Sequence, residues 1–452
     1  MGQRSRAEAF FLSRSEMNFY LITLGCPKNE VDSEMMAQLL LEEGHRAVAD
    51  PDEADVLIAN TCAFIRDARN ESLATLTELA RSKRADQALV AAGCLAQRDA
   101  DTICRRVPQV DAVLGTRSWS EIASVVNRLA QRRQGVSRTV REQGNLVASV
   151  HRLAMNGRSA YLKIADGCDA GCAFCAIPLI KGPQASKPIE DILREARELV
   201  DQGVQELILI AQDTTAYGRD LGLPDGLPML LERLADIVPQ EGWIRILYAY
   251  PQHISDALVA TMAALPQVCH YLDLPLQHGH PEMLRRMRRP HDVAAIHDRI
   301  GALRRGMPDI ALRSTFIVGF PGETEAEFQA LLGLIEEIAF DHVGVFTYSR
   351  ERGTLAAEMP DQVPAAVALK RHEEAMLAQQ AISYRRNREQ IGRVLKVLVD
   401  ENVEGQAVTR SYRDAPDIDG TVLVPTDTPL DGFLTVRITG AEPYDLVGQL
   451  LD

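Results

Sequence analysis

The sequence lacks a long hydrophobic run. No apolar stretch in its 452 residues approaches the roughly 18 residues that a membrane-spanning helix needs. The first sixteen residues contain an apolar patch at 10–12, which is too short for the core of a signal peptide. We therefore expect residues 1–16 to be a disordered tail, or an over-extended start before Met17, and the protein to be cytoplasmic with no membrane association.

An excess of positive charge is absent as well. The chain contains 49 Lys and Arg residues against 63 Asp and Glu residues, which gives a net charge of −14. A protein that binds nucleic acid is more often basic, because it neutralises phosphate groups. No direct nucleic-acid binding is therefore expected, and the acidity indicates a partner of another kind.

Cysteine, by contrast, is present in an informative pattern. Because we expect no export signal, the eight cysteines are expected to be reduced thiols or ligands and not disulfides. Three of them, Cys168, Cys172 and Cys175, form a CxxxCxxC loop directly after an apolar run. Three thiolates so close together can hold an iron–sulfur cluster, but a 4Fe–4S cluster normally takes four cysteines. The loop would leave one iron open to another ligand, and open positions are where metal chemistry occurs. The alternative is three unrelated buried cysteines.

Three more cysteines follow strand-like runs near the N-terminus. These short apolar runs lie at 19–24, 55–59 and 88–92. Helical patterns lie between them at 34–41, with Ser33 as a plausible N-cap, and at 71–81. The alternation predicts a doubly wound parallel sheet over residues 17–135. The carboxyl ends of parallel strands share one edge, so we expect Cys26, Cys62 and Cys94 to converge, although any one of them could simply close a strand. Two cysteines lack this placement and are expected to be ordinary buried thiols: Cys104 and Cys269.

Strands and helices alternate again after a polar linker at 136–153. The strand-like runs are 161–165, 206–211, 244–250, 271–275, 312–318 and 342–348. The helical patterns between them are 189–200, 228–237, 254–264, 293–305 and 325–338. Such units predict a partial (β/α)6 barrel over 154–384, open on one side. Active sites of βα barrels lie at the C-terminal ends of the strands, so the CxxxCxxC loop should lie at the barrel mouth.

Several residues near this mouth are weaker candidates for binding a cofactor. Phe174, between two loop cysteines, could lean on an adenine ring or could pack the loop. Gln212 and Asp213 end the second barrel strand, where they could contact a ribose or an amino group, or form a polar turn. The turn from Gly319 to Glu323 could admit a cofactor close to the backbone or merely reverse the chain. Two histidines are expected to be loop residues more than ligands: His278 and His280.

The last segment, 385–452, changes character. Short strand-like runs at 394–399, 406–410, 421–424, 433–438 and 446–451 are separated by Asp, Gly and Pro turns. They predict a small antiparallel β-barrel of OB-like type, a fold that often binds single-stranded nucleic acid. Residues 391–452, however, contain five Lys and Arg against eleven Asp and Glu, a net charge of −6. An acidic surface would attract a cationic protein, although it could also be an ordinary solvated face.

A resemblance to a known family follows from these motifs. The CxxxCxxC loop after the first strand of a βα barrel resembles the radical S-adenosylmethionine (SAM) superfamily. Together with the three-cysteine domain in front, the chain from about Tyr20 onward is similar to the methylthiotransferases, and within them to those that modify a ribosomal protein. The stretches that carry this resemblance are LGCPKNEVDSE at 24–34, QDTTAYG at 212–218, LDLPLQH at 272–278 and VGVFTYS at 343–349.

The resemblance implies a mechanism and a set of partners. In such enzymes Cys168, Cys172 and Cys175 would ligate a 4Fe–4S cluster whose free iron takes SAM. Cys26, Cys62 and Cys94 would ligate a second 4Fe–4S cluster, which carries or donates the inserted sulfur. The implied substrate is an aspartate β-carbon of the small-subunit ribosomal protein S-twelve, and the implied partners include an electron donor and a sulfur donor. The acidic tail resembles the TRAM domain and would bind the ribosomal protein.

One departure and two alternatives remain. Lys181 and Lys187 stand where the family usually has arginines, and lysine keeps the charge but loses the bidentate fork. One alternative function is a tRNA adenosine methylthiotransferase. The other is a non-catalytic iron–sulfur electron carrier or binding module, which would need neither an open iron nor a barrel.

Overall fold

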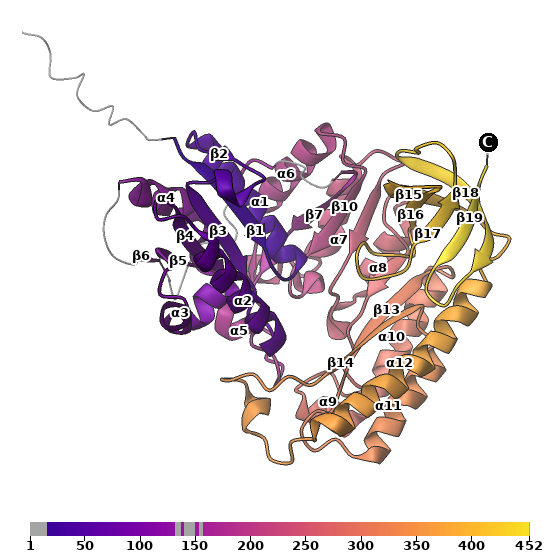
Figure 1. Ribbon diagram of the computed structural model, residues 1–452. Helices are drawn as coiled ribbons and strands as arrows, with labels where there is room; N and C mark the ends of the chain where they lie inside the picture. Colours follow the sequence, from indigo (N-terminus) through magenta and orange to yellow (C-terminus); the bar gives the residue numbers. More distant parts are fainter. Residues whose placement is uncertain (1–15, 132–136, 140–149, 153–156, 452) are drawn as a thin grey trace, which may run out of the picture. The chain divides into compact units, whose positions relative to one another are not determined.

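The computed structural model describes residues 16–131, 137–139, 150–152 and 157–451 (Figure 1). They form two compact units. Unit 1 comprises the chain up to Arg152 together with Leu179–Lys181, and unit 2 comprises the remainder. Of the tail predicted at 1–16 only residue 16 is described. Of the linker predicted at 136–153, residues 137–139 and 150–152 are described, and 137–139 form a strand of the unit 1 sheet.

Unit 1 is built on a parallel sheet that is six-stranded in its described part, in the order β2-β1-β3-β4-β5-β6. Its strands are β1 (Asn18–Thr23), β2 (Arg46–Ala47), β3 (Val56–Thr61), β4 (Ala88–Gly93), β5 (Ala112–Gly115) and β6 (Ser137–Thr139). The helices are α1 (Pro27–Glu42), α2 (Arg66–Ser82), α3 (Cys94–Arg106) and α4 (Ile122–Ala130). α1 packs against α4, and α2 against α3. The strand order reverses at β1, which confirms the predicted doubly wound sheet.

The start of α1 differs from the prediction. The helix begins at Pro27 and Cys26 is its N-cap residue, so Ser33 lies inside the helix and is no cap. Pro27 favours this start because its fixed φ suits the first helical position. The Ser33 hydroxyl instead accepts hydrogen bonds from Thr23 Oγ1 (2.7 Å) and Asn60 Nδ2 (2.9 Å), so it ties α1 to β1 and β3.

Unit 2 begins with the predicted partial barrel. Its strands form two parallel three-stranded sheets, β7-β10-β11 and β12-β13-β14, joined by a parallel bridge between Ile244 and Val268. The strands are β7 (Ser159–Lys163), β10 (Glu206–Ile210), β11 (Trp243–Ile246), β12 (Tyr271–Asp273), β13 (Ala311–Val318) and β14 (His342–Thr347). The helices between them are α6 (Ile189–Asp201), α7 (Gly226–Ala235), α8 (Asp256–Ala264), α10 (Val293–Gly306) and α11 (Glu325–Ile338). One continuous aliphatic core fills the space between strands and helices.

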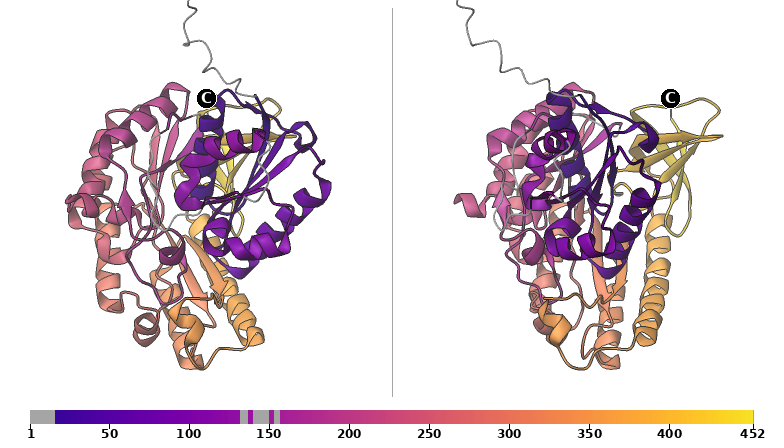
Figure 2. Two further views of the ribbon diagram at one scale, coloured as in Figure 1. Left: turned by 90° about the vertical axis from the view of Figure 1, so that its left-hand side faces the viewer. Right: turned by 60° about the vertical axis from the view of Figure 1, so that its left-hand side comes forward.

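In unit 1, β2, β5, β6, α3 and α4 were not predicted, and several elements of unit 2 were not predicted either. The latter are α5 (Ile177–Ile180), the hairpin of β8 (Ala165–Asp166) and β9 (Ala185–Ser186), α9 (Pro281–Arg286) and α12 (Ala365–Arg388). The long helix α12 leads directly into the C-terminal barrel (Figure 2). The boundary predicted at 384/385 therefore falls inside a helix. None of the helices in the described ranges has the length and apolar character that crossing a membrane requires.

The C-terminal segment forms a closed barrel in the order β15-β16-β17-β19-β18. Its strands are β15 (Val394–Val403), β16 (Gln406–Ser411), β17 (Val422–Pro425), β18 (Phe433–Ala441) and β19 (Leu446–Leu450). The sequence predicted an antiparallel barrel. One pair of strands departs from this prediction, because β17 and β19 pair in parallel. This pair closes the barrel without a hairpin, since β18 separates the two strands in the chain.

Buried charges attach this small barrel to the N-terminal ends of the partial-barrel strands. Glu206, the first residue of β10, accepts hydrogen bonds from Arg245 (2.7 Å) and from Arg410 of the small barrel (2.8 Å). Asp419 pairs with Arg313 of β13 at 3.2 Å. Further contacts across the same boundary are Tyr271 with Asp419, Arg413 with Asp341, and Trp243 with Phe433. The two barrels thus form one unit, with the small barrel at the end opposite to the CxxxCxxC loop.

Candidate functional site

The first group of cysteines lies at the switch point of the unit 1 sheet. Cys26 follows β1, Cys62 follows β3, and Cys94 is the first residue of α3 after β4. β1 and β3 are neighbours, while β2 lies on the other side of β1. Ligands of doubly wound sheets bind in the crevice that opens at such a reversal, beyond the carboxyl ends of the strands. The three thiols predicted to converge therefore lie where this fold binds its ligands.

Two glycines allow the turns that carry these cysteines to approach one another. Gly25 has φ +104°, and a Cβ on it would lie 2.9 Å from the sulfur of Cys62. Gly93 has φ +92°, and a Cβ on it would lie 2.2 Å from Asn60 Oδ1. A side chain at either position would combine an unfavourable backbone conformation with a steric clash. The close approach of the turns consequently depends on glycine.

The surroundings of these thiols make them harder to deprotonate when no metal is bound. Burial raises the pKa of Cys94 far above its ordinary value, and Lys181 opposes this shift. Burial also raises the pKa of Cys62, and Cys26 adds to the shift of both thiols by charge repulsion. Lys181 Nζ lies 3.1 Å from Asp32 Oδ2 inside unit 1. A bound cation would supply the positive charge that three thiolates need.

The second group, the CxxxCxxC loop of unit 2, is held by backbone hydrogen bonds. The amide of Cys168 donates to the carbonyl of Gly182 (3.1 Å), and the amide of Ala173 donates to the carbonyl of Met287 (2.9 Å). The carbonyl of Ala173 accepts from the amide of Ala356 (2.8 Å). Segments from three parts of the partial barrel therefore fix the loop.

Each sulfur of this loop accepts a hydrogen bond. The amide of Ala170 donates to Cys168 Sγ (3.5 Å), and the amide of Ile177 donates to Cys175 Sγ (3.4 Å). Cys172 Sγ receives its hydrogen bond from the side chain of Arg289 (3.8 Å). Burial raises the pKa of Cys168 to about 11 and that of Cys175 to about 12, and these amide hydrogen bonds partly oppose it. Hydrogen bonds to ligating sulfurs are a means by which proteins tune iron–sulfur clusters.

Both groups offer three thiols but, in the described part of the chain, no site for a single metal ion. Among the described residues, no three His, Cys, Asp or Glu side chains are close enough to hold one metal ion. A cluster distributes its cysteines over several iron atoms, so its ligands lie farther apart than the ligands of one ion. Soft thiolate donors are those that iron–sulfur clusters take.

A cavity of about 360 Å³ opens beside the CxxxCxxC loop. Its lining includes Asp169, Asp213, Arg219, Tyr250 and His253. Asp213 Oδ2 lies 2.7 Å from His253 Nδ1, and its other oxygen accepts from the amide of Ala216 (3.1 Å). The volume lies within the range that small-molecule ligands use.

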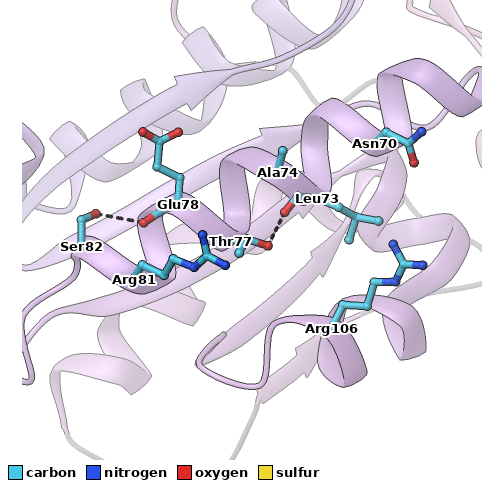
Figure 3. A pocket seen from close by; sticks show the side chains of 8 residues that line it. All are labelled: Asn70, Leu73, Ala74, Thr77, Glu78, Arg81, Ser82 and Arg106. Atoms are coloured by element: carbon cyan, nitrogen blue, oxygen red, sulfur yellow. Dashed lines mark hydrogen bonds between the residues drawn. The ribbon is translucent and has the colours of Figure 1, made fainter.

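A larger cavity lies elsewhere, on the outer side of α2. It measures about 950 Å³ and is shown in Figure 3 with the residues that line it. Those residues are Asn70, Leu73, Ala74, Thr77, Glu78, Arg81, Ser82 and Arg106. The lining contains neither a thiol nor an imidazole, so the chemistry described above points to the smaller cavity.

The predicted cofactor-binding residues divide into two groups. Gln212 and Asp213 lie at the mouth: Gln212 Nε2 donates to Asp166 (2.8 Å), and in the described structure its Oε1 is buried without a hydrogen-bond partner. Phe174 instead packs edge-on against Phe320, with ring centroids 6.5 Å apart.

Sequence reasoning did not find Tyr250, because the strand expected at 244–250 ends at Ile246. Other residues that it missed are Arg219, His253 and Arg289.

The turn after β13 is held by its own residues. The Glu323 carboxylate accepts hydrogen bonds from the amide of Gly319 (2.5 Å) and from Arg371 (2.7 Å), and it contacts His278 Nε2 (3.1 Å). His280 accepts a hydrogen bond from the amide of Glu282 at the start of α9. Glu323 therefore fixes the turn, and its contact with a cofactor stays a prediction.

The lysines that replace family arginines both form buried ion pairs. Lys187 Nζ donates to the two oxygens of Glu195 (2.7 and 2.9 Å), and Lys181 pairs with Asp32 as described above. In each case one carboxylate meets a compact ammonium group, so the planar fork of arginine is not needed for the pair.

Comparison with known proteins identifies the class to which the fold and the loop belong. Family models match residues 18–115 ("Uncharacterized protein family UPF0004"), 162–335 ("Radical SAM superfamily") and 391–451 ("TRAM domain"). The radical SAM methyltransferase TsrM from Kitasatospora setae, solved with cobalamin and a [4Fe-4S] cluster, shares the fold with a TM-score of 0.55 at 12% identity, covering 74% of this chain and 75% of that chain. The cobalamin-dependent SAM radical enzyme OxsB reaches a TM-score of 0.54 at 10% identity, covering 81% and 56%. The protein is a radical SAM enzyme, a class that uses a 4Fe–4S cluster and SAM.

Curated relatives narrow the class to one family. A protein of a Roseiflexus species is 49% identical, covering 96% of this chain and 98% of the relative. A protein of Chloroflexus aurantiacus is 50% identical, covering 96% and 100%. Both are named "Ribosomal protein uS12 methylthiotransferase RimO". The chain belongs to the RimO family of methylthiotransferases.

Proposed function

We propose that this protein inserts a methylthio group at the β-carbon of an aspartate in ribosomal protein uS12. The observation that carries the proposal is the presence of two separate three-thiol sites in a chain that matches RimO proteins over nearly its whole length. The β-carbon of an aspartate has no acidic proton, so general acid–base groups alone would not activate it. Radical chemistry is suited to such a carbon–hydrogen bond.

The residues of unit 2 would bind and orient the reactants. Cys168, Cys172 and Cys175 would hold the cluster that accepts SAM. When bound, the cluster and SAM together supply the radical that abstracts hydrogen. Asp213, which lines the cavity, and its neighbour Gln212, whose Oε1 has no hydrogen-bond partner among the described residues, would accept hydrogen bonds from the amino group or the ribose of SAM. The cavity beside the loop would keep water away from the reacting groups.

The residues of unit 1 would bind the group that carries or donates the inserted sulfur. Cys26, Cys62 and Cys94 would hold a second 4Fe–4S cluster, which carries or donates the inserted sulfur atom. Turnover then requires an electron donor and a source of sulfur, and a second SAM molecule supplies the methyl group. The convergence of the three thiols at the sheet reversal supports this assignment.

The small C-terminal barrel would bind the ribosomal protein. Its exposed acids are Glu401 near the end of β15, Glu404 in the turn between β15 and β16, and Asp427 in the loop after β17. The tip of the β15–β16 hairpin and the loop after β17, here called the acidic loops, are joined by reciprocal hydrogen bonds between Asn402 and Leu430 (2.9 Å each). The basic residues Arg410 and Arg413 are buried against the partial barrel and do not offset this charge at the surface. Such a surface suits a cationic protein better than a nucleic acid.

Mass spectrometry of both substrate classes tests the proposal. In a strain that lacks this gene, uS12 should carry an unmodified aspartate, and the wild-type gene should restore the methylthio group. The Cys172→Ala variant should not restore it. An intact aspartate modification together with the loss of a methylthiolated tRNA nucleoside would contradict the proposal in favour of the tRNA enzyme. Absence of SAM cleavage by the reconstituted, reduced protein would favour a non-catalytic iron–sulfur protein.

A further inference from the structure

Arg289 stands out among the buried cations of unit 2 because, within the described residues, no carboxylate lies within ion-pair distance of it. The residue is 7% exposed, and its Nε has no hydrogen-bond partner there. A buried charge without a counter-charge is destabilising by several kcal/mol. By contrast, the buried arginines Arg245 and Arg410, which join the two barrels, share the carboxylate of Glu206.

The guanidinium of Arg289 is held in place from three sides. One nitrogen donates to the carbonyl of Pro275, just beyond β12. The guanidinium carbon lies 4.2 Å from the ring centroid of Tyr250, which follows β11. The other terminal nitrogen lies 3.8 Å from Cys172 Sγ. This geometry directs a fixed cation at the middle cysteine of the loop.

The backbone before Arg289 couples this residue to the loop. Met287 is the C-cap residue of α9, and its carbonyl accepts a hydrogen bond from the amide of Ala173, between Cys172 and Cys175. Arg288 then adopts φ +55°, which turns the chain so that the amide of Arg289 returns to the carbonyl of Leu284 (2.8 Å). The same short turn therefore fixes both the loop and the cation.

We propose that Arg289 is the counter-charge of the cluster held by Cys168, Cys172 and Cys175 and that it raises the reduction potential of this cluster. One electron from a low-potential donor adds one negative charge to the cluster, and no proton needs to move. A fixed cation and an N–H···S hydrogen bond stabilise the more negative, reduced state. Arg289 is thus a positioning residue that makes reduction easier. This inference rests on the proposed function insofar as the three cysteines hold a cluster.

Reduction potentials measured on the reconstituted full-length protein test the inference. Titration followed by electron paramagnetic resonance should resolve the two clusters, and added SAM identifies the one in unit 2. In Arg289→Met, reduction of this cluster should become at least about tenfold less favourable, a downward shift of about 59 mV for one electron. The cluster of unit 1 should not shift. Arg289→Lys should shift less than Arg289→Met, because it keeps the charge.

The matched control is Arg285→Met, which removes the same charge from an exposed position on α9 where Arg285 contacts Glu282. An unchanged potential in iron-loaded Arg289→Met, or an equal shift in Arg285→Met, would overturn the inference. If no neutral variant holds iron in unit 2 while Arg289→Lys does, the site requires the cation and the inference stands. Iron loss in Arg289→Lys as well would indicate a packing role and overturn it. A wild-type protein without iron at these cysteines would instead contradict the proposed function.

Discussion

At the scale of single residues, the six cysteines form two sets that differ in which groups stabilise negative charge on their sulfurs. The sulfurs of the CxxxCxxC loop receive hydrogen bonds from two amides and Arg289. In unit 1, Cys94 lies near Lys181, which opposes the rise of its pKa caused by burial. Each set thus has its own source of positive charge, which is consistent with two clusters that are assembled independently.

Iron analysis checks this independence. Cys62→Ala and Cys172→Ala should each lose about half of the iron of the reconstituted protein, about four atoms of roughly eight. The reason is that each variant removes one of only three protein ligands from one cluster. Cys269→Ala, which changes a buried thiol outside both sets, should keep the full content and serves as the control. If Cys62→Ala retained all of its iron, the site in unit 1 would be wrong.

At the scale of elements, the junction of the two barrels contains a network of buried charges. Glu206 is fully buried, and burial alone would raise its pKa, but Arg410 and Arg245 outweigh burial and lower the pKa to about 2. Because the folded-state pKa lies below the ordinary value of 4.5, the stabilisation is complete above about pH 4.5. It is lost as the pH falls from there toward 2.

Replacement of this carboxylate should therefore loosen unit 2. Glu206→Gln leaves Arg245 and Arg410 buried without their shared counter-charge, which should lower the free energy of unfolding by about 3–5 kcal/mol. The variant should also lack this part of the acid sensitivity of the wild type. Denaturation at several pH values measures both effects. Glu241→Gln removes the carboxylate of an exposed pair with Lys396 and should change stability by less than about 1 kcal/mol; similar losses in both variants would contradict the argument.

The helices and strands also show which parts of the fold can be predicted from the sequence. Strands such as β3 and β10 are buried on both faces, so they appear as continuous apolar runs, and the cysteine that follows β3 could be placed from topology alone. The helix α12 was missed because charged residues crowd its sequence and its apolar stripe is narrow. Arg289 could not be predicted because it follows an irregular turn at Arg288 and not the end of a strand. Contacts made across such turns depend on backbone geometry that no local pattern records.

At the scale of the molecule, the proposed function would place substrate binding and chemistry at opposite ends of unit 2. The small barrel is attached to the N-terminal ends of the strands, whereas the CxxxCxxC loop lies at their C-terminal ends. A strand such as β13, with eight residues, spans about 26 Å. A partner bound by the acidic loops would have to reach over a distance of roughly this order to place an aspartate at the mouth. The acidic loops should therefore speed encounter with the substrate without orienting the reacting carbon.

Charge reversal on the acidic loops distinguishes attraction of the substrate from positioning of its reacting carbon. Replacing Glu401, Glu404 and Asp427 by lysine should lower the association rate of uS12 by about tenfold at low salt, because electrostatic steering is lost. The difference should shrink toward 1 M salt, where the Debye length falls to about 3 Å. The rate at saturating uS12 should change little, since the cysteine sites are untouched.

The control for this experiment carries the same change of net charge on another surface of unit 2. Glu336, Glu373 and Glu374 are exposed on α11 and α12, and lysine at these three positions should leave the association rate nearly unchanged. Equal effects of the two triple variants would mean that only the total charge matters. The triple variant at Glu401, Glu404 and Asp427 could instead show a much lower rate at saturating uS12 with an unchanged association rate. That result would mean that the small barrel helps to position the reacting aspartate, because only such a group can change the rate once binding is complete.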